Sequence, residues 1–172
     1  NGVALCTERA VLRIGVAISM NVAFETLGCK VNHYESEALK AMFEKRGYET
    51  ADFSEYADVY VINTCTVTNQ SDAKSRKMIR KAARRNPEAV IAVIGCYAQI
   101  DSETIAGIDG VDIVMGTVNR PRLLEYVERF LRERKPIRDI SETKGLKAFD
   151  ALKLDHYEKN TRAFLKIQDG CN

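Results

Sequence analysis

The stretch Val-Tyr-Val-Ile-Asn-Thr-Cys-Thr at residues 59–66 carries the pattern on which the rest of this chain depends. Its first four residues are apolar and mostly β-branched or aromatic, which is typical of a strand buried on both faces of a parallel sheet. Two polar residues come next, and Cys65 stands directly after them. Ligands of open α/β sheets bind at the carboxyl ends of the strands. The stretch therefore predicts a buried strand that delivers a thiol to the functional edge of a sheet.

Two other stretches repeat this arrangement. The apolar run at residues 22–27 leads into Gly28-Cys29, and the run at 90–94 leads into Gly95-Cys96. A glycine before the cysteine permits a tight turn and a close approach of the backbone to a ligand. We therefore expect three strands that each deliver a cysteine at the same end.

The residues between these strands have the apolar periodicity and the end signals of helices. We expect helices at about 34–46, 70–85, 102–106 and 121–134, and further strands at 48–53 and 112–115. Such an alternation predicts a flavodoxin-like or Rossmann-like α/β fold, with a five-stranded parallel sheet flanked by helices. In the flavodoxin-like order 2-1-3-4-5, strands one, three and four are neighbours. This order would gather Cys29, Cys65 and Cys96 at one edge, although they are far apart in sequence.

The pattern also divides the chain. Residues 20–135 carry the strand–helix alternation, and residues 136–160 are polar and charged, as in a linker. Residues 1–19, which include Cys6, fit poorly with this alternation, and we expect them to be an extension foreign to the native protein. A last strand pattern at 163–167 leads to Cys171, so we interpret residues 161–172 as the start of a second, truncated domain.

Composition excludes several classes of protein. The 172 residues have a formal net charge of +2, which is too small to require a polyanionic partner. No apolar run approaches the roughly 20 residues that a membrane span needs. The five cysteines are widely spaced and odd in number, so they do not suggest a disulfide framework. We infer a reducing compartment, and hence a cytoplasmic protein.

The three strand-end cysteines allow more than one interpretation. Free cysteines are commonly small core residues, but three at equivalent strand ends favour a site. Thiolates are soft ligands that suit zinc or iron–sulfur clusters. No histidine completes a zinc site, because we expect His33 at the surface. Three thiolates are one fewer than the usual four, which would leave one coordination position open for a substrate.

The helix expected at 70–85 is strongly basic, with no acidic residue between Asp72 and Glu88. Two interpretations explain this pattern equally well. The basic face is either simply solvated, or it attracts a phosphate backbone. The candidates for contact with RNA are Lys74, Lys77, Arg80, Lys81 and Arg84.

Three motifs together carry a family resemblance. They are Thr-Leu-Gly-Cys-Lys-Val-Asn at 26–32, Asn-Thr-Cys-Thr-Val-Thr at 63–68 and Gly-Cys-Tyr-Ala-Gln at 95–99. From residue 20 onward the chain resembles the N-terminal domain of the radical S-adenosylmethionine methylthiotransferases. The first two motifs resemble the branch that converts N6-threonylcarbamoyladenosine, next to the tRNA anticodon, to its 2-methylthio derivative.

The resemblance implies two 4Fe–4S clusters in the full-length enzyme. Cys29, Cys65 and Cys96 would bind the auxiliary cluster, and Cys171 would be the first ligand of the radical cluster, in a Cys-x-x-x-Cys-x-x-Cys motif. The implied partners are tRNA, S-adenosylmethionine and an electron donor such as flavodoxin or ferredoxin, and the implied protein is a monomer. No catalytic residue is assigned. We expect this chain alone to be inactive, because the other two cysteines of that motif, the barrel and the RNA-binding domain are not in it.

Four alternatives stay open at this stage. Sister branches of the family act on isopentenyladenosine in tRNA or on a ribosomal protein. A non-enzymatic iron–sulfur module is a third possibility. The fourth is a flavodoxin-like domain with core thiols and no cofactor. A flavin-type phosphate loop is not indicated, because residues 28–32 lack the serine, threonine and glycine content of such a loop.

Overall fold

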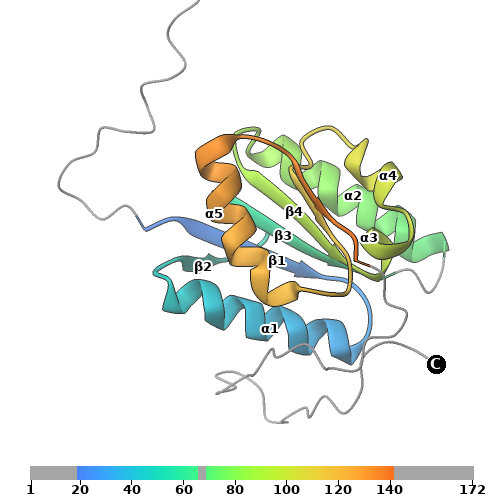
Figure 1. The fold of residues 1–172 in the computed structure, drawn as a ribbon, viewed down its shortest axis with the longest axis horizontal. Coiled ribbons are helices and arrows are strands. Elements are labelled where there is room, and N and C mark those ends of the chain that lie inside the picture. Colours follow the sequence, from blue (N-terminus) through green and yellow to red (C-terminus); the bar gives the residue numbers. More distant parts are fainter. Residues whose placement is uncertain (1–18, 66–68, 142–172) are drawn as a thin grey trace, which may run out of the picture.

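Six parallel strands form a single sheet in the computed structural model, which describes residues 19–65 and 69–141 (Figure 1). The order of the strands is β2-β1-β3-β4-β5-β6. The sheet is therefore the expected flavodoxin-like arrangement with one strand added at the β5 edge. The strands are β1 (Asn21–Thr26), β2 (Glu49–Ala51), β3 (Val59–Thr64), β4 (Val90–Gly95), β5 (Ile113–Met115) and β6 (Ile137–Asp139).

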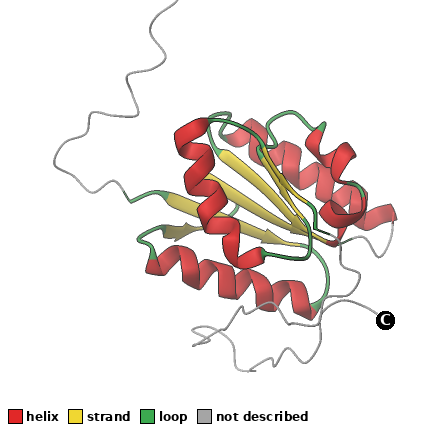
Figure 2. Ribbon diagram, viewed as in Figure 1, coloured by secondary structure: helices red, strands yellow, loops and turns green. Residues whose placement is uncertain are grey.

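Helices cover both faces of the sheet (Figure 2). Alternate residues of a strand point to opposite faces, and the core accordingly divides into two clusters. Val59 and Val61 of β3 pack with residues of α1 and α5, whereas Tyr60 and Ile62 pack with residues of α2, α3 and α4. The helical segments are α1 (Lys30–Lys45), α2 (Asn69–Arg85), α3 (Cys96–Ile100), α4 (Ser102–Ala106), the 3-10 helix η1 (Arg120–Arg122) and α5 (Leu123–Glu133).

The strand β6 corrects the sequence analysis, which places these residues in a linker that begins at residue 136. Its three residues pair in parallel with β5, and only Ile137 among them is buried. A short edge strand with one buried side chain does not differ in pattern from a polar loop. The remainder of the expected linker, the strand expected at 163–167, Cys6 and Cys171 lie outside the described residues.

The register of the central strands aligns their carboxyl ends. Thr26 of β1 is opposite Asn63 of β3, and Thr64 of β3 is opposite Gly95 of β4. All six residues of β3 and all six of β4 are buried. The segments after β1, β3 and β4 therefore leave the sheet side by side, as the predicted order requires.

The described part of the chain contains no helix that is both long and apolar enough to cross a membrane.

Candidate metal centre

The three predicted cysteines come after the three central strands at this common edge. Cys29 precedes the first residue of α1 and is exposed, while Cys96 begins α3 and is half-buried. Cys65 comes directly after β3 and is buried. The thiols thus range from open to solvent to enclosed, although they belong to one edge.

Two glycines with positive φ angles bring the loops into contact. Gly28 has a φ of +122°, and a Cβ atom there would lie 2.5 Å from the Cβ and 3.0 Å from the Sγ of Cys65. Gly95 has a φ of +102°, and a Cβ atom there would lie 2.4 Å from the carbonyl oxygen of Thr64. Any side chain at either position would push the cysteine-bearing loops apart.

The electrostatic environment of Cys96 also indicates that the thiols are neighbours. Burial raises the pKa of the Cys96 thiol, and the nearby Cys65 and Cys29 raise it further. Arg120 acts in the opposite direction. A bound metal would instead lower the pKa of the Cys96 thiol, because a cation favours the thiolate form of its ligands.

A buried ion pair lies beside this edge. The Arg120 Nη1 atom in η1 is 2.8 Å from the Glu35 Oε1 atom in α1, and their side chains are only 5% and 1% exposed. Both charges are close enough to Cys96 to affect the pKa of its thiol. The sequence analysis missed this pair, because a charged residue on an amphipathic helix is ordinarily expected to face solvent.

The possible metal ligands near this edge are the three thiols. Within residues 19–65 and 69–141, no three His, Cys, Asp or Glu side chains are grouped so that they could hold one metal ion. The cysteine ligands of a 4Fe–4S cluster bind different iron atoms, so they stand further apart than the ligands of one zinc ion. His33 is exposed, as expected. The three thiols at this edge are soft donors, of the kind that iron–sulfur centres and zinc sites use.

The basic helix α2 has the expected two faces. Its inward side includes Ser75, Ile79 and Ala82, which are fully buried. The five candidates for contact with RNA are all exposed: Lys74, Lys77, Arg80, Lys81 and Arg84. The guanidinium of Arg76 instead donates a 2.7 Å hydrogen bond to the hydroxyl of Tyr97, the residue after Cys96. The basic helix is thus bonded directly to a cysteine-bearing segment.

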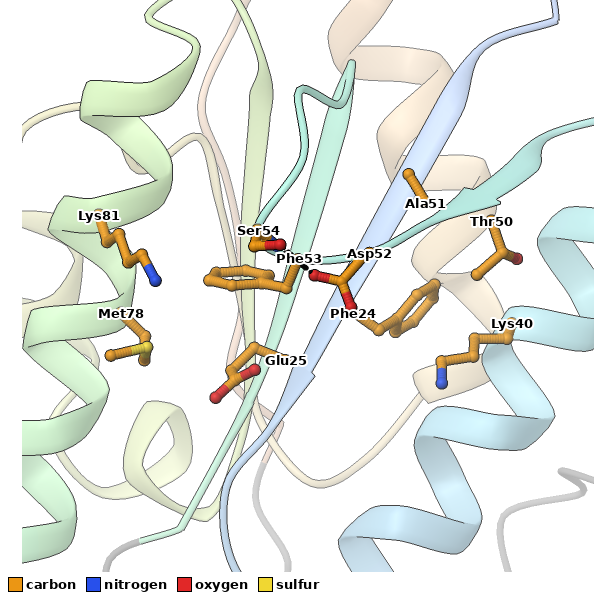
Figure 3. A pocket seen from close by; sticks show the side chains of 10 residues that line it. All are labelled: Phe24, Glu25, Lys40, Thr50, Ala51, Asp52, Phe53, Ser54, Met78 and Lys81. Carbon is orange, nitrogen blue, oxygen red and sulfur yellow. Dashed lines mark hydrogen bonds between the residues drawn. The ribbon is translucent and has the colours of Figure 1, made fainter. Parts of the chain in front are cut away.

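A cavity of about 320 Å³ opens at the outer edge of β1, where the short strand β2 ends (Figure 3). Its lining mixes the carboxylates of Glu25 and Asp52 with the ammonium groups of Lys40 and Lys81. The other lining residues are Phe24, Thr50, Ala51, Phe53, Ser54 and Met78. None of the three cysteines contributes to it, so this cavity is separate from the candidate metal centre.

Comparison with known proteins places the chain in a family. Residues 21–116 match the model of the family described as "Uncharacterized protein family UPF0004". The chain belongs to this family. The matched range includes all three strand-end cysteines and the whole of the basic helix.

Curated relatives confirm the resemblance to the methylthiotransferases. The "Threonylcarbamoyladenosine tRNA methylthiotransferase MtaB" of Bacillus subtilis is 53% identical over 151 residues, which are 88% of this chain and 34% of that protein. The protein of the same name from Aquifex aeolicus is 43% identical over 89% of this chain and 37% of its own length. The "tRNA-2-methylthio-N(6)-dimethylallyladenosine synthase" of Clostridium perfringens is 30% identical over 86% of this chain and 34% of that protein. The chain thus spans about a third of the length of these relatives.

Proposed function

We propose that this chain is the N-terminal part of a tRNA methylthiotransferase that converts N6-threonylcarbamoyladenosine, next to the anticodon, to its 2-methylthio derivative. The observation that carries the proposal is the 53% identity to a relative named for that substrate, over a range that includes Cys29, Cys65 and Cys96. The relative named for dimethylallyladenosine is only 30% identical. The threonylcarbamoyl substrate is therefore favoured over the isopentenyl one.

Within that enzyme, this domain would hold the auxiliary 4Fe–4S cluster through Cys29, Cys65 and Cys96. Support comes from their convergence at one sheet edge and from the softness of thiolate ligands. When bound, such a cluster supplies an iron without a cysteine ligand, which can carry the sulfur destined for the adenine. The thiols must lose their protons to act as ligands, and the charge of Arg120 favours this loss at Cys96.

The remaining requirements of the reaction are a second cluster and a surface that binds tRNA. Cys171 would be the first ligand of the second cluster, and that cluster would supply the reductive chemistry on S-adenosylmethionine, with a flavodoxin or ferredoxin as the electron donor. The exposed basic face of α2 would attract the phosphate backbone of the tRNA toward the cysteine edge. A monomeric, cytoplasmic enzyme would suit such a soluble substrate.

A gene deletion tests the substrate. Removing the gene of the full-length protein should abolish the 2-methylthio group on threonylcarbamoyladenosine in tRNA and leave the unmethylthiolated nucleoside, as measured by mass spectrometry of digested tRNA. Methylthiolated isopentenyladenosine should stay at its normal level. Unchanged 2-methylthio-threonylcarbamoyladenosine would reject this substrate assignment.

Anaerobic reconstitution with iron and sulfide tests the role of the domain. The chain should acquire the broad visible absorbance of a 4Fe–4S cluster, and Cys65→Ala should lose it, because one of three ligands is gone. The double variant Cys6→Ala/Cys171→Ala is the matched control, since it removes two thiols outside the proposed site. Full iron binding by Cys65→Ala would show that Cys65 is not a ligand and would reject the proposed three-cysteine site.

The basic face is tested in the full-length enzyme. Replacing Lys77, Arg80 and Arg84 together with Ala should weaken tRNA binding roughly 10-fold or more at low salt and reduce the dependence of the affinity on salt. Replacing Arg122, Arg132 and Arg138, which are exposed on other elements, controls for the change in net charge. Equal affinities for the two triple variants would mean that the α2 face is only solvated.

A further inference from the structure

The side-chain amide of Asn32 connects two of the cysteine-bearing loops. Asn32 lies in the first turn of α1, three residues after Cys29, and is only 3% exposed. Its Nδ2 atom lies 3.3 Å from the carbonyl oxygen of Leu27, which precedes the Gly28-Cys29 turn. The same atom lies 3.1 Å from the carbonyl oxygen of Thr64, which precedes Cys65. One amide group therefore donates to the main chain on both sides of the gap between these loops.

A second buried amide completes this connection. Asn32 Nδ2 also lies 3.2 Å from Asn63 Oδ1, and Asn63 Nδ2 donates back to the main-chain oxygen of Asn32 at 3.0 Å. Asn63 is fully buried at the end of β3. The hydroxyl of Thr64 continues the network by donating to the carbonyl oxygen of Ile94, two residues before Cys96, at 2.6 Å. The ends of all three central strands are thus joined by side-chain hydrogen bonds.

The orientation of the Asn32 amide is fixed by its surroundings. Three acceptor oxygens face Nδ2, so the reverse orientation would oppose oxygen to oxygen. The Oδ1 atom is therefore turned to the other side, where the Cys29 Sγ donates to it at 3.1 Å. The amide that joins the two loops also directs the side chain of Cys29.

We propose that Asn32 is a positioning residue for the cysteine site, which holds the Cys29 loop against the Cys65 loop at the separation that cluster binding requires. The proposal rests on the proposed role of these cysteines as cluster ligands. Ligands that are oriented in advance by their neighbours lose less conformational freedom when the metal binds. Removal of such a supporting group typically weakens metal binding roughly 10-fold to 100-fold.

The chain contains a matched control for this residue. Asn86 is also 3% exposed, and its Nδ2 donates to the carbonyl oxygen of Ala57 at 2.8 Å. Its Oδ1 accepts a hydrogen bond from the main-chain N–H of Glu88. Ala57 precedes β3 and Glu88 precedes β4. Asn86 therefore links the segments that enter these two strands, at the amino-terminal edge of the sheet opposite the cysteines. Asn86→Ala should destabilise the fold by a similar mechanism without touching the cysteines.

The experiment compares anaerobic reconstitution of the 172-residue chain in three forms: unchanged, Asn32→Ala and Asn86→Ala. Iron and sulfide bound per chain are titrated below the melting temperature of every form, and the cluster is characterised by its electron paramagnetic resonance spectrum and its reduction potential. We expect both variants to melt at lower temperature. Only Asn32→Ala should bind the cluster roughly 10-fold to 100-fold more weakly and show a changed spectrum or potential.

The possible results separate this inference from the proposed function. If the unchanged chain binds no cluster, the proposed function fails and the inference fails with it. If the unchanged chain binds a cluster that Cys65→Ala cannot bind, and Asn32→Ala equals Asn86→Ala in affinity, spectrum and potential, only the inference is overturned. If Asn32→Ala does not fold, Asn32→Ser replaces it, since the shorter polar side chain also lacks the bridging amide.

Discussion

The polar side chains at the two edges of the sheet form different kinds of hydrogen bond. At the amino-terminal edge, two half-buried carboxylates accept hydrogen bonds from main-chain N–H groups of the strands: Asp58 accepts from Asn21 at 2.8 Å, and Asp112 accepts from Ile91 at 2.9 Å. At the carboxyl edge, the Asn32–Asn63 network joins three loops around three thiols. The hydrogen bonds at the first edge join strands to one another, and those at the second join the segments that carry the cysteines. Under the proposed function, the buried amides at the carboxyl edge would serve the cluster site as well as stability.

Two ion pairs join α1 to the η1–α5 segment, one buried and one largely exposed. The largest loss of stability is expected when the buried pair is broken. Glu35→Ala leaves the buried guanidinium of Arg120 without its 2.8 Å carboxylate partner. Because removing one partner from a buried ion pair is costly, the free energy of unfolding should fall by about 3–5 kcal/mol. Urea denaturation monitored by circular dichroism measures this change.

The exposed pair near the other end of α1 is the control. Arg46 and Glu128 are 2.6 Å apart, but their side chains are 61% and 26% exposed. Glu128→Ala should leave the free energy of unfolding nearly unchanged, because water and salt screen such pairs. A large loss of stability in Glu128→Ala, or a small one in Glu35→Ala, would contradict the assignment of these roles.

The glycines of the two edges provide the next comparison. Gly95→Ala should reduce the free energy of unfolding by about 3 kcal/mol, because strain at positive φ adds to a clash with the Thr64 carbonyl oxygen. Gly47, at the end of α1, has a similar φ of +98°, but a Cβ atom there would meet nothing within 4 Å. Gly47→Ala should cost only about 1 kcal/mol. Equal losses of stability in urea denaturation would show that the loops at the carboxyl edge can move apart freely.

Alkylation of the metal-free chain should distinguish the three thiols. Cys29 is exposed, whereas Cys96 is half-buried with a raised pKa and Cys65 is buried. The thiolate is the reactive form, so Cys29 should react with iodoacetamide at neutral pH about 10-fold faster than Cys96. Peptide mapping by mass spectrometry gives the rate at each position. Alkylation in urea, where all three should react alike, is the control, and equal rates in the native chain would contradict the described burial.

The central strands and the cysteine edge could be predicted from sequence because buried parallel strands have an unmistakable composition. Each of the three runs that end in a cysteine is a described strand, and their order is the expected one. The helix α3 was not predicted, because it begins at Cys96 directly after β4 and no side chain caps it. The strand β6 was missed because only Ile137 in it is buried. The Glu35–Arg120 pair joins residues far apart in sequence, and a local pattern carries no sign of such a partner.

The smallest expected effect concerns Asp112 at the amino-terminal edge. Burial raises the pKa of this carboxyl more than the hydrogen bond from Ile91 and the charge of Arg134 lower it. The folded state therefore binds the proton more tightly than the unfolded state. The contribution of the protonated Asp112 carboxyl to stability is present at low pH. It is lost as the pH rises from about 4 through the raised pKa of Asp112 in the folded state.

Asp112→Asn keeps an acceptor for the Ile91 N–H and removes the titration. The variant should be equal to or more stable than the unchanged chain at pH 7, by less than about 1 kcal/mol, because solvent screens this half-buried group. Denaturant midpoints of both proteins are measured at several pH values between 4 and 7. They show how steeply the stability of each protein changes with pH. The difference in stability between the variant and the unchanged chain is compared at the two pH values. If this difference turns against the variant between pH 4 and pH 7, the ionised carboxylate itself stabilises this edge. In that case, charge as well as hydrogen bonding would close the fold at the edge opposite the cysteines.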